Sequence, residues 1–147
     1  MIDLTPCGPD DAAALLPCMQ AFYAEEGLAF DAARQGAALA ALLADRALGR
    51  VYWIGDRLGY VAVTAAFSLE FGGAFALLDE LWLRPEARGR GLGAAALRQA
   101  CEALAASGHH AVRLEVERHN AHARGLYARV GFVAHDRDLM TWVPAGR

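Results

Sequence analysis

Residues 79–93 read DELWLRPEARGRGLG, and this stretch decides the fold. We expect an apolar strand to end at Leu83, followed by a short turn and a loop that alternates arginine with glycine. A helix rich in alanine and leucine follows over residues 94–106. Glycine lets a backbone approach a ligand closely, and the first turn of a helix leaves N–H groups unpaired at the positive end of its dipole. The stretch therefore predicts a cradle for a pyrophosphate, to which Arg88 and Arg90 add positive charge.

Composition predicts one soluble globular domain over residues 1–147. The chain has 147 residues, is 56% hydrophobic and carries a net charge of −3, which excludes a disordered protein. Every one of the 14 basic residues is arginine, but these arginines are scattered and the balance is acidic. A nucleic-acid-binding groove is therefore not expected.

Cysteine usage and hydropathy favour a cytoplasmic protein. Cys7, Cys18 and Cys101 are odd in number and lack CxxC spacing, so they predict neither a disulfide framework nor a zinc site. The N-terminus lacks a signal-peptide pattern, and no apolar run reaches the ~18 residues of a membrane helix. The five histidines form no metal-binding pair of the HExxH type, so we expect no metal.

Hydrophobic periodicity and turn signals predict an α/β fold. Strands are expected over residues 1–5, 51–54, 58–67, 75–83, 112–116, 132–134 and 139–143. Helices are expected after Asp10 or Asp11, and over residues 31–45, 94–106 and 120–130. The order β-α-α-β-β-β-α-β-α-β-β indicates a mixed sheet of six to seven strands with helices on both faces.

The anion cradle resembles two nucleotide-binding motifs that its context disfavours. Residues 91–96 satisfy G-x-G-x-x-G/A, with Glu115 and Glu117 about 20 residues further on, as in a dinucleotide fold. However, residues 84–89 separate the strand from the glycines, and hairpin signals precede the motif. A dinucleotide-binding oxidoreductase thus remains a minor alternative, and a Walker A loop is excluded because it needs a lysine.

The segment resembles the signature of the GNAT superfamily of N-acetyltransferases. The R-x-x-G-x-G loop of that superfamily is present as Arg88-Gly89-Arg90-Gly91-Leu92-Gly93. Its second signature, N-x-x-A-x-x-L-Y-x-x-x-G-F, is present over residues 120–132. The acidic pair before the loop is similar to that of spermidine/spermine acetyltransferase-like members, with Asp-Glu in place of Glu-Asp.

The resemblance implies an acetyl-CoA cleft where the strands over residues 75–83 and 112–116 splay apart. The pyrophosphate would bind to backbone N–H groups of the loop, and the pantetheine arm to the backbone of residues 81–83. Asn120 would support the arm, and Tyr127 would point at the sulfur. The implied cofactor-binding residues are Leu81, Trp82, Leu83, Arg88, Gly89, Arg90, Gly91, Leu92, Gly93, Asn120 and Tyr127.

The catalytic candidates are a phenol and an acidic pair. Tyr127 would protonate the departing thiolate, because a phenol has a pKa near 10. A backbone N–H near Leu81 or Trp82 would bind the oxyanion. In a regular strand Asp79 would share a face with residues 75, 77, 81 and 83, and it is the first candidate base. Glu80 is the alternative, since a bulge would swap the two sides, and a water chain or a deprotonated amine would make a base unnecessary.

Acidic and aromatic residues around the expected pocket suit a cationic amine. The substrate-binding candidates are Tyr23, Glu25, Phe67, Glu70 and Glu115. We therefore expect direct acetyl transfer to a primary amine of a small molecule, such as a polyamine, an amino acid or an amine antibiotic. A protein or peptide amine and a non-catalytic CoA or acyl-CoA sensor are the alternatives. Family members often pair through C-terminal strands, so a homodimer through residues 139–143 is expected.

Overall fold

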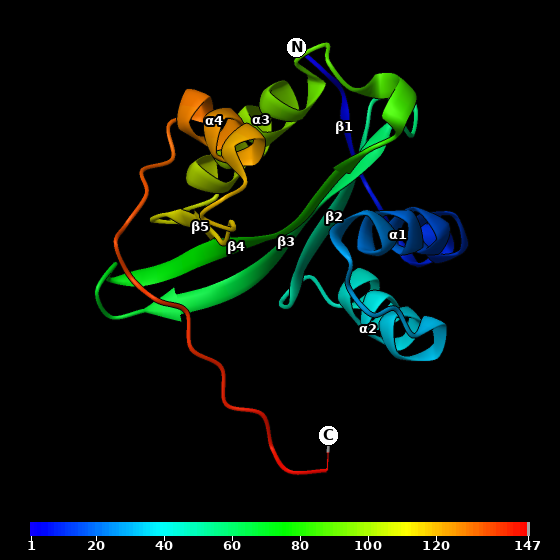
Figure 1. Cartoon of the computed structure of the whole chain (residues 1–147), viewed down its shortest axis with the longest axis horizontal. Coiled ribbons are helices and arrows are strands. Elements are labelled where there is room, and N and C mark those ends of the chain that lie inside the picture. The colour runs from blue at the N-terminus through cyan, green and yellow to red at the C-terminus, as the bar shows by residue number, and fades with distance from the viewer. Residues whose placement is uncertain (147) are drawn as a thin grey trace.

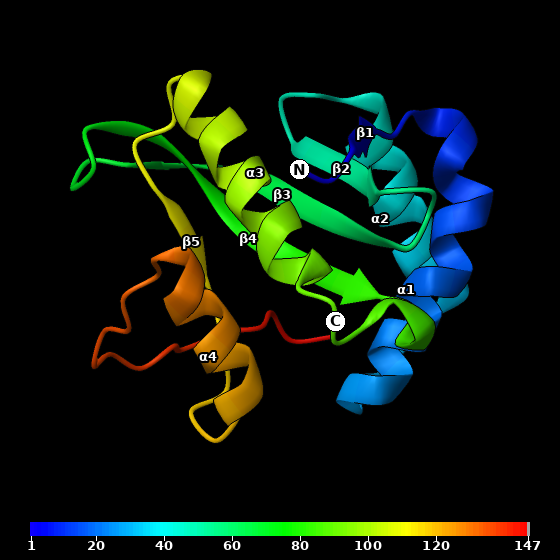
Figure 2. The same cartoon turned by 90° about the horizontal axis from the view of Figure 1, so that it is seen from above.

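The computed structural model describes residues 1–146, which form one five-stranded sheet in the order β1-β2-β3-β4-β5. Helices α1 and α2 lie on one face of the sheet, and α3 and α4 lie on the other (Figures 1 and 2). The elements in chain order are β1 (Leu4–Pro6), η1 (Pro9–Asp11), α1 (Ala12–Glu26), α2 (Ala32–Ala44), β2 (Gly49–Ile54), β3 (Gly59–Ser68), β4 (Gly73–Leu83), η2 (Pro85–Ala87), α3 (Leu92–Ala106), β5 (Val112–Leu114) and α4 (Ala121–Val130).

The two strands at the predicted cleft part soon after they meet. Strands β1 to β4 pair antiparallel, whereas β5 runs parallel to β4. The β4–β5 pairing covers only Ala76 to Leu78 of β4, opposite Val112 to Leu114. Strand β4 continues to Leu83 beside β3 alone. One edge of its C-terminal half is therefore open to a ligand.

A β-bulge changes which side chains of β4 share a face. Ala62 of β3 pairs with Glu80 and Val63 pairs with Leu78, so Asp79 is the extra residue on β4. Because the extra residue interrupts the alternation, Asp79 and Glu80 both point toward α1 and α2. The expectation that residues 81 and 83 share a face with Asp79 is therefore wrong. Leu81 and Leu83 pack in the opposite core, against α3 and α4.

Each face of the sheet has its own apolar core. The α1/α2 core contains Leu15, Met19, Leu39, Val51, Trp53, Tyr60, Ala62 and Trp82. The α3/α4 core contains Ile54, Val61, Val63, Ala76, Leu78, Ala96, Leu97, Ala100 and Leu104. The alternating residues of β3 supply both cores, which explains why this strand is apolar on both sides.

Local capping sets two of the helix starts. The Asp31 side chain accepts from the backbone N–H groups of Ala33 and Arg34 at the start of α2. Asn120 accepts from the N–H of Ala123 at the start of α4, and Gly131 ends that helix with a left-handed φ of 118°. The sequence pattern predicted these helices within about a residue.

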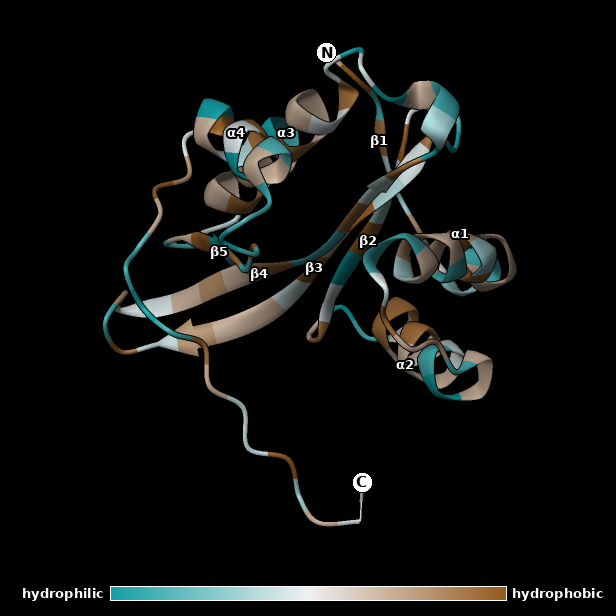
Figure 3. Ribbon diagram, viewed as in Figure 1, coloured by the Kyte–Doolittle hydropathy of each residue, from teal (hydrophilic) through white to brown (hydrophobic). Residues whose placement is uncertain are grey.

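The sheet has five strands in the described residues, so the prediction of six to seven is wrong. Residues 132–134 and 139–143 form no strands, and Figure 3 shows hydrophobic stretches along this extended C-terminal segment. A strand needs a partner edge, and β5 offers only three residues. Arg118 instead holds the segment through Asp136, Asp138 and the carbonyl of residue 137.

None of the helices within residues 1–146 is both long enough and apolar enough to cross a membrane.

Candidate active site

The glycine loop forms an open cradle in front of α3. Gly89 and Gly91 have φ angles of 79° and 74°, which residues with a Cβ rarely adopt. A Cβ built on either glycine would meet nothing within 4 Å, so the space in front of the loop is clear. Helix α3 begins at Leu92 without a side-chain cap. The backbone N–H groups at its start are thus available to an anion, as a pyrophosphate site requires.

Gly93 brings three elements together at the cradle. A Cβ on this buried residue would lie 3.4 Å from Cδ1 of Leu126 and 3.6 Å from Cδ1 of Leu83. The missing side chain therefore lets α3 start against both α4 and the end of β4. This packing positions the cradle beside the open edge of β4.

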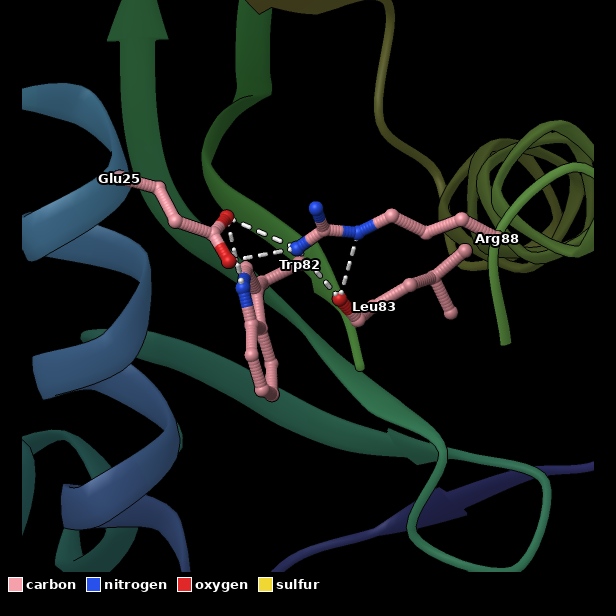
Figure 4. Close-up of polar contacts among 4 residues, drawn as sticks. All are labelled: Glu25, Trp82, Leu83 and Arg88. Carbon is pink, nitrogen blue, oxygen red and sulfur yellow. Dashed lines mark hydrogen bonds and ion pairs between the residues drawn. The ribbon is translucent and has the colours of Figure 1, made fainter. Parts of the chain in front are cut away.

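Arg88 is engaged within the protein. Its backbone N–H donates to the Pro85 carbonyl at 3.2 Å, so this amide is not available to a phosphate. Its guanidinium donates to the Leu83 carbonyl and forms a 2.8 Å ion pair with Glu25 (Figure 4). The indole of Trp82 donates to the same carboxylate at 3.2 Å. Arg88 was predicted to bind the cofactor and Glu25 the substrate, but in the structure the two side chains bind each other.

The open edge of β4 presents the backbone of Leu81 and Leu83. The backbone groups of Trp82 and Arg84 are directed toward β3. The Arg84 N–H donates to the Leu58 carbonyl, and the Trp82 carbonyl lies so close to Gly59 of β3 that a Cβ there would clash with it. Because the backbone groups alternate, those of Leu81 and Leu83 point away from β3 into the splay. Of the two predicted oxyanion donors, the Leu81 N–H therefore has the better orientation. The backbone of Trp82 is turned toward β3, and its indole packs in the α1/α2 core.

Two tyrosines hold the carboxylate of Glu80. The Tyr23 hydroxyl donates to Oε2 at 2.6 Å, and the Tyr60 hydroxyl donates to Oε1 at 2.7 Å. Burial raises the pKa of Glu80, although these hydrogen bonds act in the opposite direction, and nearby Asp79 raises it further. Burial and the Glu80 charge raise the pKa of both phenols, which therefore stay protonated as donors.

Asp79 lies at the rim of the same site. Its carboxylate makes no hydrogen bond within residues 1–146, and loss of hydration raises its pKa above the usual range. Both carboxylates line a cavity of about 130 Å³ between α1, α2 and the sheet. The site thus contains one carboxylate that is held in place and one that is available to take a proton.

Tyr127 packs against the α3/α4 core, on the face of the sheet opposite the acidic pair. It is partly buried on α4, and its ring makes an edge contact with Phe132 at 6.0 Å between centroids. Burial raises the pKa of Tyr127, and the Glu26 charge at the end of α1 raises it further. The phenol is therefore protonated at neutral pH. Asn120 caps its helix, so the side-chain oxygen of Asn120 is used within the protein.

Three of the predicted substrate-binding residues lie away from the cavity. Phe67 is 72% exposed near the end of β3 and pairs with Ala74. Glu70 is in the following turn and forms a 3.7 Å ion pair with Arg113. Glu115 is exposed after β5. None of these three residues lines the cavity, whereas Tyr23 does.

Two residues of the site were missing from the sequence prediction. Tyr60 appeared only as an apolar strand residue, and its contact with Glu80 depends on the β3–β4 register. Glu26 follows Glu25 directly in the sequence, and nothing in the sequence pattern separates the two acids. The effect of Glu26 on Tyr127 depends on how α1 ends opposite α4.

The model of the Acetyltransferase (GNAT) family matches residues 19–132. An integron cassette protein from the mobile metagenome of the Cole Harbour salt marsh is 33% identical, with a TM-score of 0.86 over 98% of this chain and 91% of that one. A candidate acetyltransferase from Arthrobacter sp. FB24 is 25% identical, with a TM-score of 0.79 over 99% and 94%.

A third solved structure is that of a predicted acetyltransferase from Clostridium acetobutylicum with acetyl-CoA. It shares the fold at 16% identity, with a TM-score of 0.79 over 96% of each chain. No curated protein sequence matches the chain.

Proposed function

The chain belongs to the GNAT family of acetyltransferases, whose donor is acetyl-CoA, and we propose that it transfers acetyl directly to a primary amine of a small molecule. The observation that carries the proposal is the β4 bulge, which puts Asp79 and Glu80 together on one face. The bulge lies where β5 leaves β4, so an acceptor at the carboxylates would adjoin the open strand edge. Polyamines, amino acids and amine antibiotics are the acceptor classes that the sequence suggested.

Two features of the chain fit acetyl-CoA. The cradle of Gly89, Gly91 and the start of α3 suits the pyrophosphate, and the outward backbone groups of Leu81 together with the N–H of Leu83 suit the amides of pantetheine. When bound, acetyl-CoA supplies an activated acetyl group as a thioester. We propose that Arg90, Leu92 and Gly93 also contribute to the cradle. Within residues 1–146, the one hydrogen bond of the Arg90 guanidinium is to the Glu86 carbonyl at 3.3 Å, a contact that a phosphate can replace.

We propose that Asp79 is the base and that Glu80 positions the amine. An ammonium needs to lose a proton before its nitrogen can attack, and Asp79 has no competing hydrogen bond in the described chain. A raised pKa makes a carboxylate a better proton acceptor near neutral pH. Glu80, already oriented by two phenols, accepts a hydrogen bond from the amine. Glu80 as the base is the alternative.

The remaining steps fall to Leu81 and Tyr127. As the C–N bond forms, the Leu81 N–H stabilises negative charge on the acetyl oxygen. As the C–S bond breaks, the Tyr127 phenol gives its proton to the leaving sulfur. The attacking nitrogen loses its second proton to solvent as the amide forms, and solvent returns one proton to Tyr127. Asp79 releases the amine proton to solvent, so the enzyme returns to its starting state. No covalent acetyl-enzyme is needed, because none of the three cysteines lines the cavity.

We propose that the protein is a cytoplasmic homodimer. Its three cysteines are free, as in a reducing compartment. The C-terminal segment exposes several large apolar side chains, namely Val133, Leu139, Met140, Trp142 and Val143. A second copy that covers them would remove an apolar patch unusual for a monomer. Light scattering at micromolar concentration tests this, and a monomer would contradict it.

Free-thiol release from acetyl-CoA over a panel of amines tests the proposed activity. We expect release that requires an amine and saturates with its concentration. Tight CoA binding without amine-dependent release would favour the sensor alternative. A stabilising effect of NAD(P)H without one of acetyl-CoA would contradict the donor assignment.

A further inference from the structure

We propose that the acceptor is a primary monoamine with a compact apolar body, such as an arylalkylamine or a short alkylamine. The inference rests on the proposed function and concerns the cavity between α1, α2 and the sheet. The lining of this cavity has two parts of opposite character. Its polar part consists of the acidic pair and two phenols, and most of the rest is hydrocarbon.

The walls and size of the cavity suit one small apolar group. Seven of the lining side chains are apolar, namely Leu15, Met19, Ala38, Leu39, Leu42, Val51 and Ala62. The volume of about 130 Å³ is close to that of an apolar cavity of roughly 150 Å³ that binds benzene. A phenyl ring or a short alkyl chain would fill it, whereas a sugar-based amine antibiotic would be too large and too polar.

The polar part of the lining recognises a single ammonium. Asp79 and Glu80 are the two carboxylates that line the cavity, and both lie on β4. The hydroxyls of Tyr23 and Tyr60 direct their protons to Glu80. An ammonium at this point therefore meets oxygen atoms that can accept its hydrogen bonds. An amine nitrogen bound here lies where β4 loses its β5 partner, next to the outward backbone of Leu81.

The rest of the lining has no carboxylate for a second cation. Gln35 is the remaining polar residue in the lining, and its side-chain oxygen already accepts from the Asp31 N–H at 2.8 Å. The amide nitrogen of Gln35 is a donor, which an ammonium cannot use. A second ammonium held against the apolar lining would therefore have no charged partner, and this disfavours the binding of a diamine. The acidic pair alone suggested polyamines, but the cavity argues against them.

A pair of isosteric amines tests this inference directly. Pentylamine and 1,4-diaminobutane have the same number of non-hydrogen atoms. Pentylamine ends in a methyl group where 1,4-diaminobutane has a second ammonium. Thiol release at saturating acetyl-CoA gives kcat/KM for each, with 2-phenylethylamine and ethylamine beside them. We expect pentylamine to exceed 1,4-diaminobutane by at least about 100-fold, and 2-phenylethylamine to exceed ethylamine.

A variant of α2 links the preference to this cavity. Ala38 lines the cavity but is exposed on the helix, so Ala38→Leu narrows the cavity without disturbing the core. Ala37 is exposed on the same helix and does not line the cavity, so Ala37→Leu is the matched control. We expect Ala38→Leu to lower kcat/KM for pentylamine and 2-phenylethylamine about tenfold or more, and to lower it for ethylamine by a smaller factor. We expect no effect of Ala37→Leu.

The outcomes separate this inference from the proposed function. Failure of every amine to release thiol would contradict the acetyltransferase activity itself. Release with 1,4-diaminobutane or an aminoglycoside as good as with pentylamine would overturn the monoamine inference alone. Equal effects of Ala38→Leu and Ala37→Leu would show that the apolar body does not occupy this cavity.

Discussion

The Tyr60 hydroxyl donates a 2.7 Å hydrogen bond to Oε1 of Glu80, from one strand to its neighbour across the sheet. Tyr23 of α1 donates to the other oxygen of the same carboxylate. The two phenols therefore tie α1 to the β4 bulge and fix the direction of the acidic pair. A charge-assisted bond of this kind stabilises more when the carboxyl is ionised than when it is neutral.

Tyr60→Phe should destabilise the protein more at neutral pH than in acid. The variant loses a hydrogen bond to a charged group, which is worth about 1.5–3 kcal/mol, while a neutral bond is worth about 0.5–1.5 kcal/mol. Urea unfolding at pH 7 and near pH 4 measures the difference. Tyr52→Phe, which removes a hydroxyl from β2 on the other face, serves as control. An equal loss at both pH values would contradict an ionised Glu80.

Glu80→Gln should become more stable relative to the wild type as the pH rises. Burial raises the pKa of Glu80 in the folded state, so the folded state binds the proton more tightly than the unfolded state. This contribution is present at low pH and is lost as the pH rises through the raised pKa. Glutamine has no such titration. Unfolding free energies from pH 4 to 7 should therefore shift in favour of the variant, and an opposite trend would contradict the direction.

Asp79→Asn should remove the acidic limb of the pH–rate profile. In the wild type, kcat/KM should rise with pH as Asp79 ionises, at a pH above that of an ordinary aspartate because its pKa is raised. The variant should lose about 10²–10⁴-fold in kcat, as expected for a general base. Glu80→Gln should mainly raise KM for the amine. If Glu80→Gln loses the acidic limb instead, the two roles are reversed.

Gly89→Ala and Gly91→Ala should weaken acetyl-CoA binding beyond their effect on stability. Both glycines have positive φ, and a Cβ on either would point into open space, where the phosphates are proposed to bind. Gly72 has a φ of 78° and equally open surroundings in the β3–β4 turn, so Gly72→Ala is a matched control. All three variants should lose about 1–2 kcal/mol of stability. Calorimetry should show weaker binding only in the loop variants.

Arg88→Gln should weaken acetyl-CoA, and Glu25→Gln should not. The Arg88–Glu25 pair is largely exposed, so breaking it should cost under about 1 kcal/mol of stability. Arg88 needs to leave Glu25 to reach a phosphate, and Glu25→Gln weakens that competition. We expect affinity to fall several-fold in the first variant and to stay or rise in the second. Parallel losses in both variants would show that the intact pair holds the site together.

Motifs with local physical causes were predictable from the sequence. The glycine loop, the helix caps at Asp31 and Asn120, and the order of the first five strands depend on nearby residues. The shared face of Asp79 and Glu80 was not predictable, because a bulge depends on how β3 and β4 pair. The sequence allowed a bulge without requiring one.

The C-terminal segment shows where a good pattern fails. Residues 139–143 are mostly apolar, as in the strand that the sequence predicted, but a strand forms only beside a free edge of sufficient length. The short β5 strand and the contacts of Arg118 with Asp136 and Asp138 leave this segment extended and exposed. The ion pair between Arg88 and Glu25 was equally unpredictable from the sequence, because 63 residues separate the two in the chain.

The rate of amine-dependent thiol release by Tyr127→Phe is the most direct test of the proposed mechanism, because it removes the proposed proton donor. The Tyr127 phenol is partly buried against the α3/α4 core, and Tyr52→Phe is the matched control because Tyr52 packs against the same core. We predict that kcat falls about 10²–10⁴-fold in Tyr127→Phe, while the Kd of acetyl-CoA stays nearly unchanged. Tyr52→Phe should have a kcat close to that of the wild type. A Tyr127→Phe enzyme as active as Tyr52→Phe would contradict the proposed mechanism.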